Sequence, residues 1–442
     1  MDRASTSSAW RLIVTSESHP RDWTVRIADA LDQRWDEQVS FIQRLVRIPS
    51  VTGHEGEAQH AVAAKMAELG LAVDLWEPDP AELAPYALHV GKFTSLADRP
   101  NVVGIARGKG GGRSLILNAH IDTVDPGDPS RWRHDPFSGT IVGGRVFGRG
   151  ACDMKAGLAT NLFALAAVRD AGVPLAGDVI VQSVIAEEDG GAGTLAAILR
   201  GYTADAAIIT EPTNLAVIPA QGGSLVFRLR IQGKSAHACV RNEGVSAIEK
   251  FFVIYQALLA FEARRNATIA HPLYASIANK IPINIGIVHA GTWPSSVPES
   301  LIAEGRAGLV PGEDLDGFRQ EFAAVVRAAA SEDPWLHDHP PIVEWFSGQF
   351  APAEIPGDSP LVTLLQHAHS QATGQPVRID AATYGADMRH FLLFGNTPCL
   401  MYGAGDVRLA HYTDESIALE DIRTATLTIA LAIAEWCGVH DN

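Results

Sequence analysis

Three side chains between residues 118 and 157 are candidates for binding a metal ion. His120 and Asp122 stand two residues apart in Asn-Ala-His-Ile-Asp-Thr-Val, directly after an apolar run. If this run is a strand, both side chains point to the same face of it. Asp153 follows in Gly-Arg-Gly-Ala-Cys-Asp-Met-Lys-Ala-Gly, where a glycine-rich turn opens a helical pattern. A histidine with two nearby carboxylates is typical of a site for Zn²⁺ or a similar ion.

Four further candidates come later in the chain. Glu187 and Glu188 end one strongly apolar stretch, Glu211 ends the next, and His411 lies in the loop sequence Ala-His-Tyr-Thr-Asp-Glu. Adjacent carboxylates at the end of a buried strand are costly unless a cation compensates their charge. Two ions bridged by one carboxylate, about 3.5–4 Å apart, would activate a water molecule and polarise a carbonyl oxygen.

Each of these residues also has a purely structural explanation, which the sequence leaves open. Asp153 could cap a helix, because an aspartate before a helix accepts its first N–H groups. Glu187, Glu188 and Asp189 could form a solvated acidic turn, and Glu211 could simply end a strand. The histidines could be structural hydrogen-bonding residues. The occurrence of all of them at successive strand ends favours the metal site.

The pattern of apolar residues predicts the elements that must position this site. Strands alternate with helices before residue 222 and again after residue 358, which predicts an open α/β sheet with functional groups at the carboxyl ends of its strands. Between these parts, strands with alternating polarity and two long helices predict a smaller, inserted α+β domain. The expected organisation is a flexible N-terminal arm, a metal-binding domain in two pieces and the inserted domain: residues 1–23, 24–221 with 347–442, and 222–346.

Composition limits the classes of function. The 442 residues are 47% hydrophobic and carry a formal net charge of −16, which argues against binding to nucleic acid or to anionic membranes. No apolar run is long enough to span a membrane, and the first 23 residues lack the apolar core of a signal peptide. The four cysteines show no Cys-x-x-Cys spacing, so a reducing, cytoplasmic location is expected.

Taken together, these motifs resemble the metal-dependent amidohydrolase family of acetylornithine deacetylase, succinyl-diaminopimelate desuccinylase, aminoacylase and glutamate carboxypeptidase. The resemblance runs in order from about Asp32 to the last predicted helix. It implies a zinc-peptidase-like mixed sheet flanked by helices, with an inserted ferredoxin-like domain that acts in dimerisation and as a lid. It also implies a homodimer and two Zn²⁺ ions, for which Co²⁺ or Mn²⁺ could substitute.

The resemblance assigns the metal ligands residue by residue. His120 and Glu211 are expected to bind one ion, and Glu188 and His411 the other. Asp153 is expected to bridge the two ions.

Three further residues are given catalytic roles by the same resemblance. Asp122 is expected to orient His120, and Glu187 is expected to be the general base that takes a proton from the attacking water. Which member of the glutamate pair is base and which is ligand comes from the resemblance alone. His237, in Gly-Lys-Ser-Ala-His, is expected to stabilise the oxyanion of the intermediate, often in the partner subunit's site. Without the resemblance, a surface histidine next to a basic residue is the favoured explanation.

The implied substrate contacts are Asn284, Arg306 and Gly385. An arginine fork suits a carboxylate, although the position of Arg306 in an alternating strand is also compatible with a solvated face. Two departures from the family pattern bear on the substrate. Ser295 stands where the family carries the asparagine of Asn-x-Val-Pro, and Asp189 follows the glutamate pair where many relatives carry other residues.

The function that follows is hydrolysis of the amide bond of an N-acyl amino acid or a related small carboxylate-bearing amide, by metal-activated water with a glutamate base. A dipeptidase or carboxypeptidase on the same site is the alternative. A non-catalytic relative that uses the fold for binding is a third interpretation.

Overall fold

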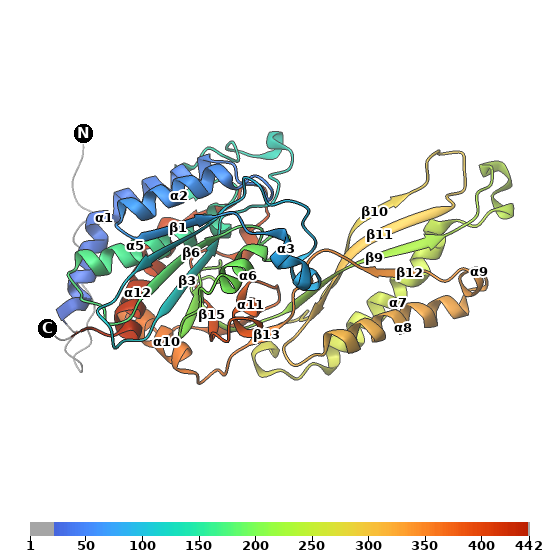
Figure 1. Ribbon diagram of the computed structural model, residues 1–442. Helices are drawn as coiled ribbons and strands as arrows, with labels where there is room; N and C mark the ends of the chain where they lie inside the picture. The colour runs from blue at the N-terminus through green and yellow to red at the C-terminus, as the bar shows by residue number, and fades with distance from the viewer. Residues whose placement is uncertain (1–21, 441–442) are drawn as a thin grey trace.

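The computed structural model describes residues 22–440, which form three sheets. The nine-stranded sheet and the four-stranded sheet lie side by side (Figure 1), and the third has three short strands. Helix α1 (Asp22–Arg47) begins the described chain, with Trp23 buried. The last two residues of the expected N-terminal arm are therefore helical, and the rest of it, residues 1–21, lies outside the described residues.

The large sheet has nine strands of mixed direction, as predicted. Its core is the parallel run β6, β3 and β7, whereas β1, β2 and β13 pair antiparallel with their neighbours. In spatial order the strands are β1 (Ala72–Trp76), β2 (Asn101–Ala106), β6 (Val179–Val184), β3 (Leu115–His120), β7 (Ala206–Ile209), β15 (Cys399–Met401), β8 (Val217–Gln221) and β13 (Ala353–Glu354), with β14 (Ile379–Ala382) beside β8.

Helices cover the large sheet. The crossovers from β3 to β6 and from β6 to β7 run in opposite directions, so right-handed connections place α5 and α6 on opposite faces. The segment Ala151–Asp170, which includes α5, is apolar and long enough to cross a membrane by composition, but it is almost wholly buried as a core helix. The main helices are α2 (Gly56–Glu68), α5 (Ala156–Asp170), α6 (Ala192–Leu199), α10 (Pro360–Thr373), α11 (Met388–Leu393) and α12 (Leu419–Cys437).

Shorter elements complete this part of the chain. The helices α3 (Pro80–Leu83) and α4 (Ala87–Val90) lie between β1 and β2 in the sequence. A small antiparallel sheet of β16 (Ser416–Ala418), β5 (Arg145–Phe147) and β4 (Thr140–Val142) joins the segment before α5 to the segment before α12.

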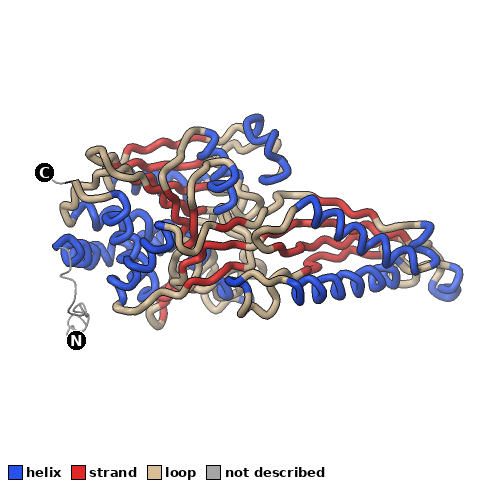
Figure 2. Tube along the Cα trace, turned by 90° about the horizontal axis from the view of Figure 1, so that it is seen from below, coloured by secondary structure: helices blue, strands red, loops and turns tan. Residues whose placement is uncertain are grey.

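The inserted segment forms the four-stranded sheet with the antiparallel order β10-β11-β9-β12. Its β-α-β-β-α-β sequence of elements is ferredoxin-like, as expected. Helices α7 and α8 cover one face (Figure 2), against which alternate residues of β9 such as Leu225 and Phe227 are buried. The elements are β9 (Gly223–Gln232), α7 (Ala247–Thr268), β10 (Ile283–Ala290), β11 (Ser300–Leu309), α8 (Leu315–Glu332), α9 (Pro334–Asp338) and β12 (Ile342–Trp345).

Candidate metal centre and active site

Three adjacent parallel strands deliver the candidate ligands to one edge of the large sheet. His120 is the last residue of β3, while Glu187 and Glu188 follow β6 and Glu211 follows β7. Because β6, β3 and β7 are parallel neighbours, their carboxyl ends meet at the same edge. The predicted convergence of strand ends is therefore present.

One donor cluster consists of His120, Asp153 and Glu211. The Nε2 atom of His120 lies 3.0 Å from Oδ1 of Asp153 and 3.9 Å from Oε1 of Glu211. The other ring nitrogen, Nδ1, lies 2.9 Å from the backbone carbonyl oxygen of Asp122, to which it must donate. This bond leaves the Nε2 lone pair free to bind a metal ion.

A second cluster shares Asp153 with the first. Nε2 of His411 lies 3.0 Å from Oε1 of Glu188 and 3.4 Å from Oδ2 of Asp153. The two carboxylate oxygens of Asp153 thus face different histidines, as the bridging role requires. Asp153 has non-helical backbone angles and the N-cap of α5 is Lys155, so Asp153 is not the cap of that helix.

The charges of the two clusters fit a cationic occupant. Burial, followed by the charges of neighbouring carboxylates, raises the pKa of Glu187 and of Glu211 well above the usual range. Burial acts in the same direction on Asp153, but hydrogen bonds with His120 and His411 hold its pKa below the usual range. Oε1 of Glu187 is buried and has no hydrogen-bond partner among the described residues. Imidazole and carboxylate donors in a buried, acidic setting suit divalent zinc or a similar ion.

Asp122 holds both His120 and the loop of Glu187 and Glu188 in place. Its carboxylate accepts the backbone N–H groups of Glu187 and Glu188, each at 3.1 Å, and the hydroxyl of Thr52 at 3.0 Å. Its backbone carbonyl, rather than its carboxylate, lies closest to Nδ1 of His120, because Oδ1 is 3.6 Å away. Asp122 therefore holds the glutamate loop as well as the histidine.

Glu415 is a positioning residue that the sequence motifs did not single out. Its carboxylate accepts the backbone N–H groups of Cys152 at 2.8 Å and Asp153 at 3.0 Å, and it pairs with Nη1 of Arg149 at 2.7 Å. It thereby ties the loop of Asp153 to the loop of His411. Glu415 ends the same short motif that contains His411, which is the signal that could have identified it.

Two more residues near the site had no role predicted from the sequence. Arg389 is fully buried and donates from Nη2 to the carbonyl oxygen of Gly190, at 2.7 Å, which fixes the turn after the glutamate pair. Burial, and then the charges of Glu211 and Asp153, raise the pKa of Tyr384 well above the usual range. The Tyr384 hydroxyl therefore stays protonated beside the clusters.

The remaining predicted residues lie apart from the clusters. His237, Asn284 and Arg306 belong to the inserted segment, and among the described residues no hydrogen bond or ion pair joins them to the metal ligands. Asn284 and Arg306 face each other across β10 and β11. A side chain at Gly385 would collide with Phe350, 2.7 Å away, so the close approach of Phe350 requires a glycine here.

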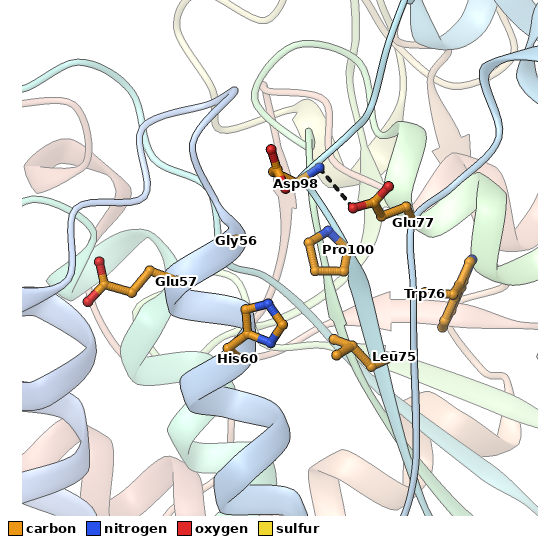
Figure 3. Close-up of a pocket in the computed structure, with 8 residues that line it drawn as sticks. All are labelled: Gly56, Glu57, His60, Leu75, Trp76, Glu77, Asp98 and Pro100. Carbon is orange, nitrogen blue, oxygen red and sulfur yellow. Dashed lines mark hydrogen bonds between the residues drawn. The ribbon is translucent and has the colours of Figure 1, made fainter.

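A cavity of about 580 Å³ lies elsewhere, between the start of α2 and the end of β1. Figure 3 shows His60 and Leu75 facing each other across it, with Glu77 and Asp98 together at one end and the Glu57 side chain pointing away. None of the candidate ligands lines this cavity, so it is separate from the metal centre.

Comparison with known proteins agrees with this geometry. The chain is 30% identical to an N-formyl-4-amino-5-aminomethyl-2-methylpyrimidine deformylase of Halalkalibacterium halodurans, over 92% of this chain and 96% of the relative. It is 28% identical to a succinyl-diaminopimelate desuccinylase of Methylocella silvestris, over 87% and 94% of the two chains.

Solved structures share the fold. A dipeptidase of Saccharomyces cerevisiae aligns with a TM-score of 0.75 at 14% identity, covering 94% of this chain and 98% of that one. Human carnosine dipeptidase 1 aligns with a TM-score of 0.72 at 15% identity, covering 94% and 99%.

Residues 116–435 match the peptidase family M20/M25/M40. This stretch contains both donor clusters and the glutamate loop. The chain is therefore a member of the peptidase family M20/M25/M40, a family of metal-dependent amidohydrolases and peptidases.

Proposed function

We propose that the protein binds two Zn²⁺ ions and hydrolyses the amide bond of an N-acyl amino acid or a related small carboxylate-bearing amide. The observation that carries the metal centre is the sharing of Asp153 by two clusters, one with His120 and Glu211 and the other with Glu188 and His411. When bound, such ions lower the pKa of water and polarise a carbonyl oxygen.

Glu187 is the proposed general base. It directly precedes Glu188, and its buried Oε1 has no partner among the described residues, so this oxygen is available to a water molecule. Glu187 takes a proton from the attacking water and returns it to the leaving amine. Asp122 keeps the base in place through the N–H bonds of the loop. His237 donates a hydrogen bond to the oxyanion that forms on the carbonyl oxygen when water adds to the carbonyl carbon.

Arg306 supports a substrate with a carboxylate. Its Nε is buried without a hydrogen-bond partner, no ion pair of its guanidinium occurs among the described residues, and burial lowers its pKa. A half-buried guanidinium without a counterion is costly, and a substrate carboxylate would compensate it. Asn284, opposite Arg306 on β10, is the proposed second contact, and Gly385, beside Phe350, is a third.

A homodimer through the inserted segment is part of the proposal. Strand β10 is an edge of the four-stranded sheet, and its Ile287 and Val288 are 46% and 47% exposed. The adjoining helix α7 exposes Ile248, Phe252 and Val253. An exposed apolar edge strand is a template for pairing with a second copy, which would also bring His237 to the partner's site.

The domain boundaries and the compartment belong to the same proposal. Residues 24–221 and 347–442 carry all the candidate ligands, and residues 222–346 form the lid. All four cysteines are free thiols, which suits a reducing compartment such as the cytoplasm.

A substrate panel with metal control tests the proposal. The purified protein is analysed for bound metal, treated with a chelator and reloaded with Zn²⁺, Co²⁺ or Mn²⁺. It is then assayed on N-acyl amino acids, dipeptides and an N-formyl aminomethylpyrimidine. Metal-dependent turnover of the first group supports the proposal. Preference for dipeptides supports the peptidase alternative. Preference for the formyl amine would contradict the proposal that the substrate must carry a carboxylate. Stable folding with neither metal nor turnover would contradict an enzymatic role.

A further inference from the structure

The turn that carries His237 is exposed but held on both sides by backbone hydrogen bonds. Before it, Lys234 and Val245 exchange two bonds of 2.8 Å. After it, the N–H of Ala238 donates to the carbonyl oxygen of Ser295 at 2.9 Å, and the backbones of His237 and Ser296 pair in an isolated antiparallel β-bridge. The imidazole therefore projects from a fixed backbone rather than from a free loop.

Both hydrogen-bonding groups of Cys239 converge on one nitrogen of His237. The backbone N–H of Cys239 lies 3.2 Å from Nδ1, and its Sγ lies 2.9 Å from the same atom. A backbone N–H can only donate, so Nδ1 must be the acceptor. In a neutral imidazole the ring proton is then on Nε2. The thiol S–H is a second, weaker donor to Nδ1.

The metal ligand His120 has the opposite arrangement. Its Nδ1 donates to the carbonyl oxygen of Asp122, which leaves a lone pair on Nε2 for a metal ion. A metal ligand needs this lone pair, whereas a group that stabilises an oxyanion needs an N–H. The two histidines thus present Nε2 in opposite states, each suited to its proposed role.

We propose that Cys239 is a positioning residue that fixes His237 as the tautomer protonated on Nε2, so that the ring presents a neutral N–H donor to the substrate oxyanion. This inference rests on the proposed function of His237 and extends it to a residue that does not itself touch the substrate. Cys239 is exposed, whereas Cys152, Cys399 and Cys437 are buried, so it is the thiol whose placement packing does not explain.

The tautomer is measured directly by nitrogen NMR of the full-length protein with isotope-labelled histidine. The signals of His237 are assigned by their loss in His237→Gln. We expect an unprotonated Nδ1 and a protonated Nε2 in the wild type, and a larger share of the other tautomer in Cys239→Ala, which keeps the backbone N–H at this position but loses the thiol donor. A protonated Nδ1 in the wild type, or an unchanged tautomer in Cys239→Ala, overturns the inference. Because this measurement needs no turnover, it stands even if the panel of amide substrates is not hydrolysed.

Kinetics test the consequence of the tautomer for turnover. Loss of one neutral hydrogen bond predicts a fall in kcat of about two- to tenfold in Cys239→Ala, with KM unchanged. Cys239→Ser, which keeps a donor, should recover most of the lost rate. In a His237→Ala background the same Cys239→Ala change should have no further effect. Val240→Ala, in the same turn, is the matched control and should leave kcat at the wild-type value. An equal loss with and without His237 contradicts a role through this histidine.

Discussion

Replacing Glu415 with alanine is expected to weaken metal binding without removing any ligand. The carboxylate of Glu415 is 1% exposed and its partner Arg149 is 4% exposed, so both charges are buried. The same carboxylate holds the N–H groups of Gly150, Cys152 and Asp153. Its loss leaves a buried guanidinium without a counterion and frees the loop that carries the bridging ligand.

The structure allows the magnitude to be worked out. Removing one partner of a buried ion pair costs about 3–5 kcal/mol, because the remaining charge stays desolvated. Loss of a residue that orients a ligand typically weakens metal affinity by about 10- to 100-fold. We therefore expect Glu415→Ala to lower the unfolding free energy of the metal-free protein and to raise the Kd for Zn²⁺ in that range. Glu415→Gln, which keeps one acceptor oxygen, should lie between this variant and the wild type.

Two measurements check this expectation: urea unfolding of the metal-free protein and competition for Zn²⁺ against a chromophoric chelator. Burial raises the pKa of Glu415 to about 7, so both are made near pH 8, where its carboxylate is mostly ionised. Glu344→Ala removes partly exposed ion pairs with Arg228 and Arg230 and is the matched control, which should change neither quantity appreciably. If Glu415→Ala binds Zn²⁺ as tightly as the wild type, Glu415 does not position the Asp153 loop.

Further outcomes follow from the same geometry. Glu187→Gln should abolish turnover while the metal content stays near normal. Loss of metal instead would indicate that Glu187 is the metal ligand and Glu188 the base. Arg306→Ala should raise KM for carboxylate-bearing amides by about 10-fold or more with a smaller change for uncharged amides, and equal changes in a steady-state comparison would contradict the proposed contact. Phe252→Glu should give monomers in light scattering if α7 lies in the dimer interface, and an unchanged mass would exclude this surface. Hydrogen bonds with Asp153 and Glu188 raise the pKa of His411 to about 10, so the metal-free site holds a proton there at neutral pH. Metal binding should therefore release protons, and metal affinity should increase as pH rises towards 10. In the metal-free protein, the stabilisation that protonated His411 gives should be complete below about pH 6.5 and should be lost as pH rises towards 10. Calorimetry in buffers of different ionisation enthalpy checks this, and a heat independent of the buffer would refute it.

The positions of the ligands were predictable because they depend on local signals. Apolar runs identify β3, β6 and β7, and in an open α/β sheet the carboxyl ends of such strands converge, so the sequence alone places His120 and Glu211 together. The division of Asp153 between two clusters agrees with the role that the family resemblance implied.

Other features depend on contacts that no local pattern records. Strand β12 is short and lies between proline-rich segments, so neither the strand nor its pairing with β9 could be predicted from the sequence. The four donors to Glu415 come from the loop around Arg149, far away in the sequence, and nothing in the spacing of either segment indicates their meeting. The same holds for Nδ1 of His237, whose environment depends on the conformation of a single turn.

The bridging position of Asp153 has a consequence for the order of assembly during synthesis. One of its oxygens faces His120, from the first half of the chain, and the other faces His411, which lies C-terminal to every other ligand. Domains generally fold as units, and the loop that carries Asp153 is held by Glu415, four residues beyond His411. Both proposed sites therefore stay incomplete until the C-terminal segment has been synthesised. Metal occupancy would then report that folding is finished, and a ribosome-bound chain that ends before His411 should retain neither ion tightly.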